Sequence, residues 1–306
     1  MSLRIHQKKS LGQHFLRSKE ALRKIIVAAD LKNGETVLEI GPGEGVLTEA
    51  LLEGGVKVIA VEADVRCVKK LEERFAEEIN GGELFLIHGD IRDETAQNKL
   101  FSKKRAAPLR SGLSRPRPDL SPLLEDKPYK LVANIPYYLT GILFRLFLEK
   151  LPARARTHAG GRQPSLLVFL VQKEVAEQIV GRNGKESILS LAIKVYGVPR
   201  YVATIKREAF SPPPNVDSAI ITVTDISRKK LGKLTDEDYF RVVKAGLGSK
   251  RKMLSGNLSR SLKIPKEKLG VIFKKLSIDE RTRGEDVPVE KWVALAQEIK
   301  KAVSLN

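Results

Sequence analysis

Cysteine is almost absent from the 306-residue chain, because only Cys67 is present. No disulfide can therefore form within the chain, and nothing indicates an oxidising compartment. No apolar run approaches the roughly 18–20 residues of a membrane helix, since the most apolar strand-like stretch covers only residues 166–171. Residues 1–6 also lack the apolar core of a secretory signal. We therefore expect a cytoplasmic, globular protein with no membrane span.

Acidic residues are scarce relative to basic ones, with 37 Asp and Glu against 55 Lys and Arg, for a formal charge of +18. Such an excess suits a polyanionic partner, either nucleic acid or an anionic membrane surface. The basic residues cluster in two stretches without any acid, residues 99–117 and 241–266. Clustering of this kind favours phosphate contact, so we expect a nucleic-acid partner.

Helical and strand patterns alternate from about residue 20 to residue 224. Apolar runs that are this short and mostly uninterrupted predict strands covered by helices on both faces, in a parallel, doubly wound α/β sheet. Two further strands, at residues 201–206 and 219–224, are expected to close it. The five parallel strands are predicted at residues 36–40, 57–61, 84–88, 131–133 and 165–171.

The pattern changes after residue 225, where every periodic segment is helical. We therefore predict a catalytic domain over residues 1–225 and a small helical domain over residues 226–306. Residues 95–127, approximately, fit neither domain, because Pro, Ser, Arg and Lys dominate there. A loop of that length inside a compact domain is either functional or disordered. We favour a flexible basic insert that assists non-specific RNA binding.

A glycine-rich turn, Gly-Pro-Gly-Glu-Gly, begins at Gly41 between a predicted strand and a predicted helix. Glycines let the backbone approach a nucleotide-like ligand closely. Glu62 ends the next strand and is placed to accept both ribose hydroxyls, while Asp90 follows the third strand and is placed to accept from an adenine amine. The Gly-x-Gly-x-Gly spacing differs from that of dinucleotide sites, so the predicted cofactor is S-adenosylmethionine.

The fourth strand ends in Asn134, Ile135, Pro136 and Tyr137, which resembles the Asn/Asp-Pro-Pro-Tyr motif of amino methyltransferases. An adenine amine is a poor nucleophile because its lone pair is delocalised into the ring. The side-chain oxygen of Asn134 and the carbonyl of Ile135 are predicted to accept from that amine and to favour a pyramidal nitrogen. Pro136 keeps the turn rigid, and Tyr137 offers a ring on which the base can stack. We predict these four as the catalytic residues, with no metal.

Four further stretches resemble motifs of a single family: KKSLGQHFL (residues 8–16), EIGPGEGVLT (39–48), FSPPPNVDS (210–218) and KRKMLSGNL (250–258). They occur in order along nearly the whole chain. The sequence therefore resembles the KsgA/RsmA family of small-subunit (16S) rRNA adenine N6,N6-dimethyltransferases. That resemblance implies a Rossmann-like S-adenosylmethionine-dependent methyltransferase sheet with a small C-terminal helical domain that binds rRNA.

The resemblance also implies roles for particular residues. His14 and Leu16 would contact S-adenosylmethionine, together with Gly41, Glu62, Asp90 and Asn134. Phe210 would pack on the target base opposite Tyr137, and Lys250, Arg251 and Lys252 would bind rRNA. The implied activity is transfer of four methyl groups to two adjacent adenosines near the 3′ end of small-subunit rRNA, on an assembling subunit. RNA-modifying enzymes of this size can act as monomers, so a monomer is expected, although the sequence leaves the oligomeric state open.

Other functions remain open at this point. The nearest alternative is the related large-subunit rRNA methyltransferase that confers macrolide resistance, although the glycine and proline motifs look closer to the small-subunit enzymes. A DNA adenine methyltransferase is less expected, because no separate base-reading domain is evident. A ribosome-assembly factor that keeps the fold without relying on catalysis is also possible, and the intact Asn134–Tyr137 motif argues against it.

Overall fold

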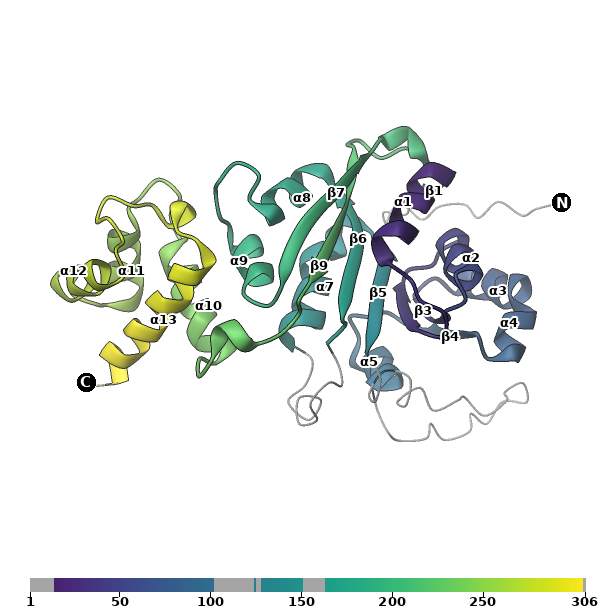
Figure 1. The fold of residues 1–306 in the computed structure, drawn as a ribbon, viewed down its shortest axis with the longest axis horizontal. Helices are drawn as coiled ribbons and strands as arrows, with labels where there is room; N and C mark the ends of the chain where they lie inside the picture. The colour runs from purple at the N-terminus through teal and green to yellow at the C-terminus, as the bar shows by residue number, and fades with distance from the viewer. Residues whose placement is uncertain (1–13, 102–123, 125–127, 151–162, 305–306) are drawn as a thin grey trace. The chain divides into compact units, whose positions relative to one another are not determined.

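The computed structural model of the protein describes residues 14–101, 124, 128–150 and 163–304, which are coloured in Figure 1. Contacts divide the chain into two compact units. The first runs to Lys173 and includes Tyr201–Thr224, and the second consists of Glu174–Arg200 and the chain from Asp225 onward. The sequence boundary at residue 225 assigned residues 174–200 to the first domain, whereas contacts group them with the second unit.

A seven-stranded sheet in the order β4-β3-β2-β5-β6-β9-β7 forms the centre of the first unit. Neighbouring strands from β4 through β6 run parallel, and β9 runs antiparallel to β6. Parallel neighbours need crossover connections, which accounts for the alternating helices. The predicted α/β class is thereby confirmed. The strands are β2 (Thr36–Ile40), β3 (Lys57–Glu62), β4 (Leu84–His88), β5 (Tyr129–Asn134), β6 (Leu166–Gln172), β7 (Val198–Ile205) and β9 (Ser218–Thr224).

One apolar cluster of this unit packs the sheet against helices that include α1 (Lys19–Ala29) and α2 (Val46–Glu53). Helix α1 begins where the Ser18 hydroxyl accepts from the amide of Ala21, which satisfies one of the unpaired N–H groups of its first turn. It buries Ile25 and Ala29, and every residue of β2 is buried. Burial on both faces explains why β2 is apolar throughout apart from Thr36 and Glu39.

The chain between β3 and β4 forms two helices, α3 (Val65–Arg74) and α4 (Ala76–Gly81). They are separated at Phe75, whose ring is buried and lies against Gly45. Other helical segments of the unit follow the strand ends. They are α5 (Glu94–Phe101), η2 (Tyr137–Leu139), α7 (Thr140–Phe144), η3 (Arg145–Lys150) and η5 (Arg207–Ala209).

Helix α5 corrects the start of the predicted basic insert, which was placed at about residue 95. Residues 94–101 are helical and bury Ala96, Leu100 and Phe101, so they belong to the packed fold. Leu100 and Phe101 follow Ala96 by four and five residues, on one side of the helix, which accounts for this packing. Most of the remaining insert, including residues 102–123, lies outside the described residues.

The second unit is helical. Its helices are α8 (Lys173–Val180), which begins one residue before the unit, α9 (Ile188–Lys194), α10 (Asp236–Gly246), α11 (Leu254–Leu262), α12 (Lys266–Lys275) and α13 (Val289–Ser304), with short η6 (Lys229–Leu231) and η7 (Gly284–Asp286). Helix α10 packs against α9, α11 and α13. The indole of Trp292 is fully buried and lies where a side chain on Gly246 would have to go. No helix among the residues described has the length and apolarity to cross a membrane.

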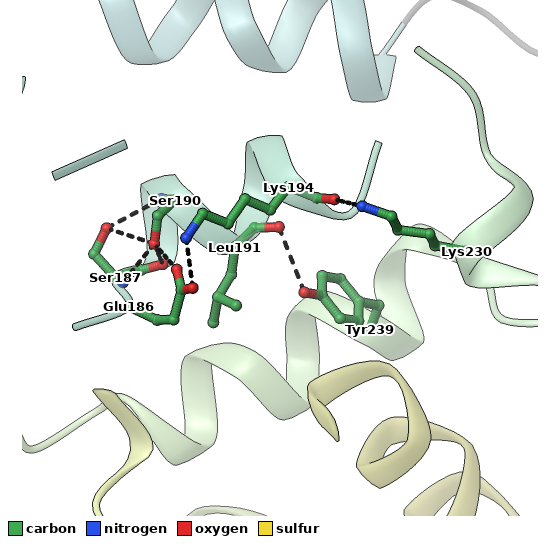
Figure 2. A network of polar contacts seen from close by, with 7 residues as sticks. All are labelled: Glu186, Ser187, Ser190, Leu191, Lys194, Lys230 and Tyr239. Atoms are coloured by element: carbon green, nitrogen blue, oxygen red, sulfur yellow. Dashed lines mark hydrogen bonds and ion pairs between the residues drawn. The ribbon is translucent and has the colours of Figure 1, made fainter. Parts of the chain in front are cut away.

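Polar contacts tie α9 to the helices that follow residue 225 (Figure 2). The Lys194 ammonium donates to Glu186 at 2.6 Å, while the Lys194 carbonyl accepts from Lys230 at 2.5 Å. The Tyr239 hydroxyl donates to the carbonyl of Leu191 at 3.4 Å. The bond from Lys194 to Glu186 stays within this segment, whereas the bonds from Lys230 and Tyr239 reach it from the chain after residue 225. These two bonds and the packing of α9 on α10 explain why residues 174–200 group with the second unit.

Candidate active site

A cavity lies at the carboxyl ends of β2, β3, β4 and β5. Carboxyl ends of parallel strands meet at one edge of a sheet, which is where α/β proteins bind ligands. Every residue of the predicted catalytic motif and cofactor site lines this cavity, as does the predicted base-stacking phenylalanine; they are His14, Leu16, Gly41, Glu62, Asp90, Asn134, Ile135, Pro136, Tyr137 and Phe210. The structure thus brings the set together, while the role of each residue stays a prediction.

The glycine turn between β2 and α2 requires its glycines. Gly41, Gly43 and Gly45 have φ angles of +71°, +59° and +83°, a region that other residues rarely adopt. A Cβ on Gly43 would also lie 2.8 Å from Cε1 of Phe15. The turn therefore holds the backbone close to the cavity wall, and a side chain at residue 43 would push the backbone and the Phe15 ring apart.

Glu62 is fixed by two backbone amides. The amide of Gly43 donates to Oε2 at 2.9 Å, and the amide of Asp64 donates to Oε1 at 2.8 Å. Burial raises the pKa of Glu62, and these two N–H bonds partly oppose that rise. Each carboxylate oxygen has a second lone pair, so a carboxylate held in this way can still accept from a pair of hydroxyls.

Glu39 is a cavity residue that sequence reasoning missed. It lies in the middle of the buried strand β2 with 1% of its surface exposed, and Thr48 Oγ1 donates to its Oε2 at 2.7 Å. Burial raises the pKa of Glu39 to about 8, and the nearby Glu62 carboxylate adds to the rise. The signal in the sequence was an acid inside an otherwise apolar strand, where an unpaired carboxylate is costly.

Asp90, just beyond β4, is bound by a neighbouring arginine. Nε and Nη2 of Arg92 donate to both carboxylate oxygens at 2.5–3.0 Å, and the Arg92 amide donates to Oδ1 at 2.9 Å. These bonds hold the pKa of Asp90 below its usual value. The guanidinium carbon of Arg92 also lies 5.8 Å from the ring centroid of Tyr138, the residue after the predicted catalytic motif. Neither Arg92 nor Tyr138 was singled out by the sequence.

The predicted catalytic motif forms the turn between β5 and η2. Asn134 is the last residue of β5, and its Nδ2 donates to the carbonyl of His14 at 3.3 Å. With the amide in this orientation, the side-chain oxygen is the group that can accept from a ligand. Ile135 is buried, and the carbonyl of Pro136 accepts from the amide of Leu139 to begin η2.

Tyr137 is held on two sides. Its hydroxyl and the Ser218 hydroxyl share a 2.7 Å hydrogen bond, and its ring stacks with that of His14 at a centroid distance of 6.0 Å. Burial raises the pKa of the Tyr137 phenol, so it remains protonated at neutral pH. The ring is therefore a fixed apolar surface in the cavity wall.

A short two-stranded ribbon, which the sequence did not predict, supplies His14 and Phe210. Strand β1 (Phe15–Leu16) pairs antiparallel with β8 (Phe210–Ser211), and His14 Nδ1 lies 3.0 Å from the carbonyl oxygen of Pro212. The pairing joins segments nearly 200 residues apart. Phe210 is 4% exposed, so its ring is part of the core as well as of the cavity wall.

The second unit carries a basic surface of its own. Lys250, Arg251 and Lys252 are exposed, as a contact with a phosphate backbone would require, and their role stays a prediction. A bridge between Met253 and Arg283 brings the chain around residue 282 beside them. Arg281 and Arg283, also exposed, therefore extend this surface, and no local pattern pointed to them. In the described part of the chain, no cluster of His, Cys, Asp or Glu side chains could hold a metal ion.

Comparison with known proteins gives one consistent family. The profile of the family described as Ribosomal RNA adenine dimethylase matches residues 4–301. A protein of Dehalococcoides mccartyi (strain ATCC BAA-2266 / KCTC 15142 / 195) named Ribosomal RNA small subunit methyltransferase A is 36% identical over 291 residues, which is 95% of this chain and 88% of that protein.

Solved structures agree on the fold. A dimethyladenosine transferase from Plasmodium falciparum aligns with a TM-score of 0.67 at 22% identity, over 94% of this chain and 98% of that one. The 23S rRNA methyltransferase ErmE aligns with a TM-score of 0.63, also at 22% identity, over 94% and 99%. Because these two scores are so close, the fold does not separate the two kinds of enzyme, and the family match rests on sequence.

Proposed function

Because the chain belongs to the ribosomal RNA adenine dimethylase family, we propose that it dimethylates N6 of two adjacent adenosines near the 3′ end of small-subunit rRNA, using S-adenosylmethionine. The observation that carries the proposal is the convergence of the cofactor-type and base-type residues on one cavity. They come from four consecutive strand ends and from the β1–β8 ribbon. A coincidental arrangement would not place acceptors for an adenosine cofactor beside acceptors for an adenine amine.

The cavity fits the methyl donor chemically. Both oxygens of Glu62 are oriented by backbone amides, as a partner for two ribose hydroxyls requires, and Asp90 is held ionised as an acceptor for an adenine amine. Gly41 and the ribbon residues His14 and Leu16 line the same wall. When bound, the cofactor would supply an electrophilic methyl group on a positively charged sulfur.

The carboxyl of Glu39 explains how a cation could be accommodated in this buried place. With a pKa of about 8, Glu39 is largely protonated at neutral pH, and a nearby positive charge favours its ionised form. Ionisation would give the cation a buried counter-charge. The Thr48 hydroxyl is already placed to stabilise the carboxylate.

The turn at the end of β5 would act on the target amine. Asn134 Oδ1 and the carbonyl of Ile135 would accept its two N–H groups and direct the nitrogen lone pair toward the methyl group. Tyr137 and Phe210, both in the cavity wall, would hold the base once it leaves its stack. The amine proton can leave to water after transfer, so the Tyr137 phenol does not need to ionise.

The exposed cations of the second unit would supply non-specific affinity for rRNA. Lys250, Arg251, Lys252, Arg281 and Arg283 present positive charge that would release counterions on contact with phosphates. The net charge of +18 supports the same partner. We propose that the protein acts as a cytoplasmic monomer on an assembling small subunit.

The test is methyl transfer from labelled S-adenosylmethionine to under-methylated small subunits and, in parallel, to large subunits, with products identified by mass spectrometry. Dimethyladenosine on the small subunit alone is the expected result. Label on the large subunit would instead indicate an enzyme of the resistance type. Cofactor binding without label on either particle would indicate an assembly factor that has lost its chemistry.

Asn134→Ala sharpens this test, because it removes the side-chain acceptor without touching the basic surface. We expect loss of at least about a hundredfold in turnover, within the range for a group that positions reactants, while subunit binding stays within about twofold. Asn98→Ala, at an exposed position of α5, is the matched control and should retain full turnover. Unchanged turnover in Asn134→Ala would refute the assigned role.

A further inference from the structure

Tyr138 differs from the tyrosine before it in a way that the proposed mechanism does not use. The Tyr137 hydroxyl is bound by Ser218 and its ring faces His14, whereas Tyr138 leaves 48% of its surface exposed. Tyr138 nevertheless lines the cavity. Ile142, four residues on, is 42% exposed. An exposed aromatic ring beside the predicted base-binding turn gains little from burial, so its position calls for another explanation.

Arg92 holds this ring in a defined setting. Its guanidinium carbon lies 5.8 Å from the Tyr138 ring centroid, and the same group pairs side-on with Asp90. The side chain of Arg92 is itself 45% exposed. Two bonds to one carboxylate restrict the guanidinium to a single plane, so the cation and the ring form a pre-organised, solvent-facing pair.

The chemistry of this pair selects a base rather than a phosphate. Asp90 neutralises the charge of Arg92, which weakens its attraction for a phosphate but leaves its flat surface available for stacking. Unpaired bases in RNA stack on aromatic rings and on guanidinium planes, and both are present here. When one base of the RNA enters the cavity, the next base along the RNA stays at the cavity mouth.

We propose that Arg92 and Tyr138 form a subsite for the base of the nucleotide next to the adenosine being methylated. The inference rests on the proposed function, because it assumes an RNA substrate whose target base enters the cavity. With two adjacent adenosines as targets, the base in this subsite is the other adenine. Its stacking there would keep the strand in place between successive methyl transfers.

Steady-state kinetics on under-methylated small subunits provide the first test. Tyr138→Ala should raise KM for subunits by about tenfold or more, a loss typical of one base–aromatic stack, and change KM for S-adenosylmethionine by less than about twofold. Tyr138→Phe keeps the ring and should behave as wild type. Tyr201→Ala removes an aromatic ring that does not line the cavity, and it serves as the matched control.

Fluorescence then reports on the stacked base directly. Two short RNAs carry 2-aminopurine in place of one or the other of the two adjacent adenosines. The 2-aminopurine that enters the cavity stacks on Tyr137 and Phe210, so its fluorescence should change alike in wild type, Tyr138→Phe and Tyr138→Ala. The 2-aminopurine in the subsite should change its fluorescence on binding to wild type and Tyr138→Phe, and Tyr138→Ala should lose that change even at concentrations that saturate binding. The dependence of RNA affinity on salt should be the same in wild type and Tyr138→Ala, because the subsite contacts no phosphate.

Equal KM values and equal fluorescence changes in wild type and Tyr138→Ala would overturn the subsite. A weaker salt dependence in Arg92→Gln than in wild type would also overturn it, in favour of a phosphate contact. Failure of the proposed function is a separate result, since wild-type protein would then transfer no label to small subunits. If wild type transfers label to small subunits and Tyr138→Ala behaves as wild type, the subsite is refuted and the proposed function stands.

Discussion

The buried carboxyl of Glu39 should make the stability of the protein depend on pH, and replacing it with glutamine should remove that dependence. The folded-state pKa is about 8 against an ordinary value of 4.5. Between these values the folded chain keeps the proton and the unfolded chain releases it, so unfolding becomes easier as pH rises. The contribution of neutral Glu39 is thus fully present below about pH 4.5 and is lost as pH rises through 8.

The size of the effect follows from the same two values. Each pH unit in this window should lower the free energy of unfolding by about 1.4 kcal/mol, which amounts to about 3 kcal/mol at pH 7 relative to pH 4.5. Glu39→Gln does not titrate and keeps an oxygen that can accept from Thr48. Its stability relative to wild type should therefore increase by up to about 3 kcal/mol between pH 5 and pH 7.5.

Urea unfolding of wild type and Glu39→Gln at several pH values measures this difference. All other titrating groups are shared, so subtracting the two curves isolates Glu39. Glu53→Gln, at an exposed position of α2, controls for the loss of a surface carboxylate. If the difference between Glu39→Gln and wild type stays constant across the range, the carboxyl is not held neutral and the reasoning fails.

Two further outcomes are expected. Gly43→Ala should weaken S-adenosylmethionine binding at least about tenfold, measured by calorimetry, because its Cβ meets Phe15 in the cavity wall. Gly34→Ala is the control: it has a similar backbone strain with open space around it, and it should bind the cofactor normally. Comparable binding by both would contradict the wall geometry. Arg281→Ala and Arg283→Ala should each reduce the slope of log RNA affinity against log salt concentration by about one, measured by filter binding. Unaltered slopes would show that these two residues do not contact RNA phosphates.

The strands and the cavity residues followed from the sequence because their signals are local. Short apolar runs fix which segments are buried strands, and polar residues at strand ends are brought to one edge by any parallel sheet. Glu62, Asp90 and Asn134 could therefore be expected in one site before any distance was known. The same applies to the Gly41–Gly45 turn, where positive φ angles demand glycine.

Other features depend on partners far away in the chain, and only the tertiary structure decided them. The pKa of Glu39 rises because surrounding strands and helices exclude water, which no five-residue pattern reveals. The β1–β8 ribbon joins residues almost 200 positions apart, and Arg283 comes beside Met253 through a single bridge. Residues 174–200 likewise join the second unit through packing on α10. Local patterning therefore predicted most of the residues singled out for the cavity, and long-range packing decided how they are charged and held and which further residues lie beside them.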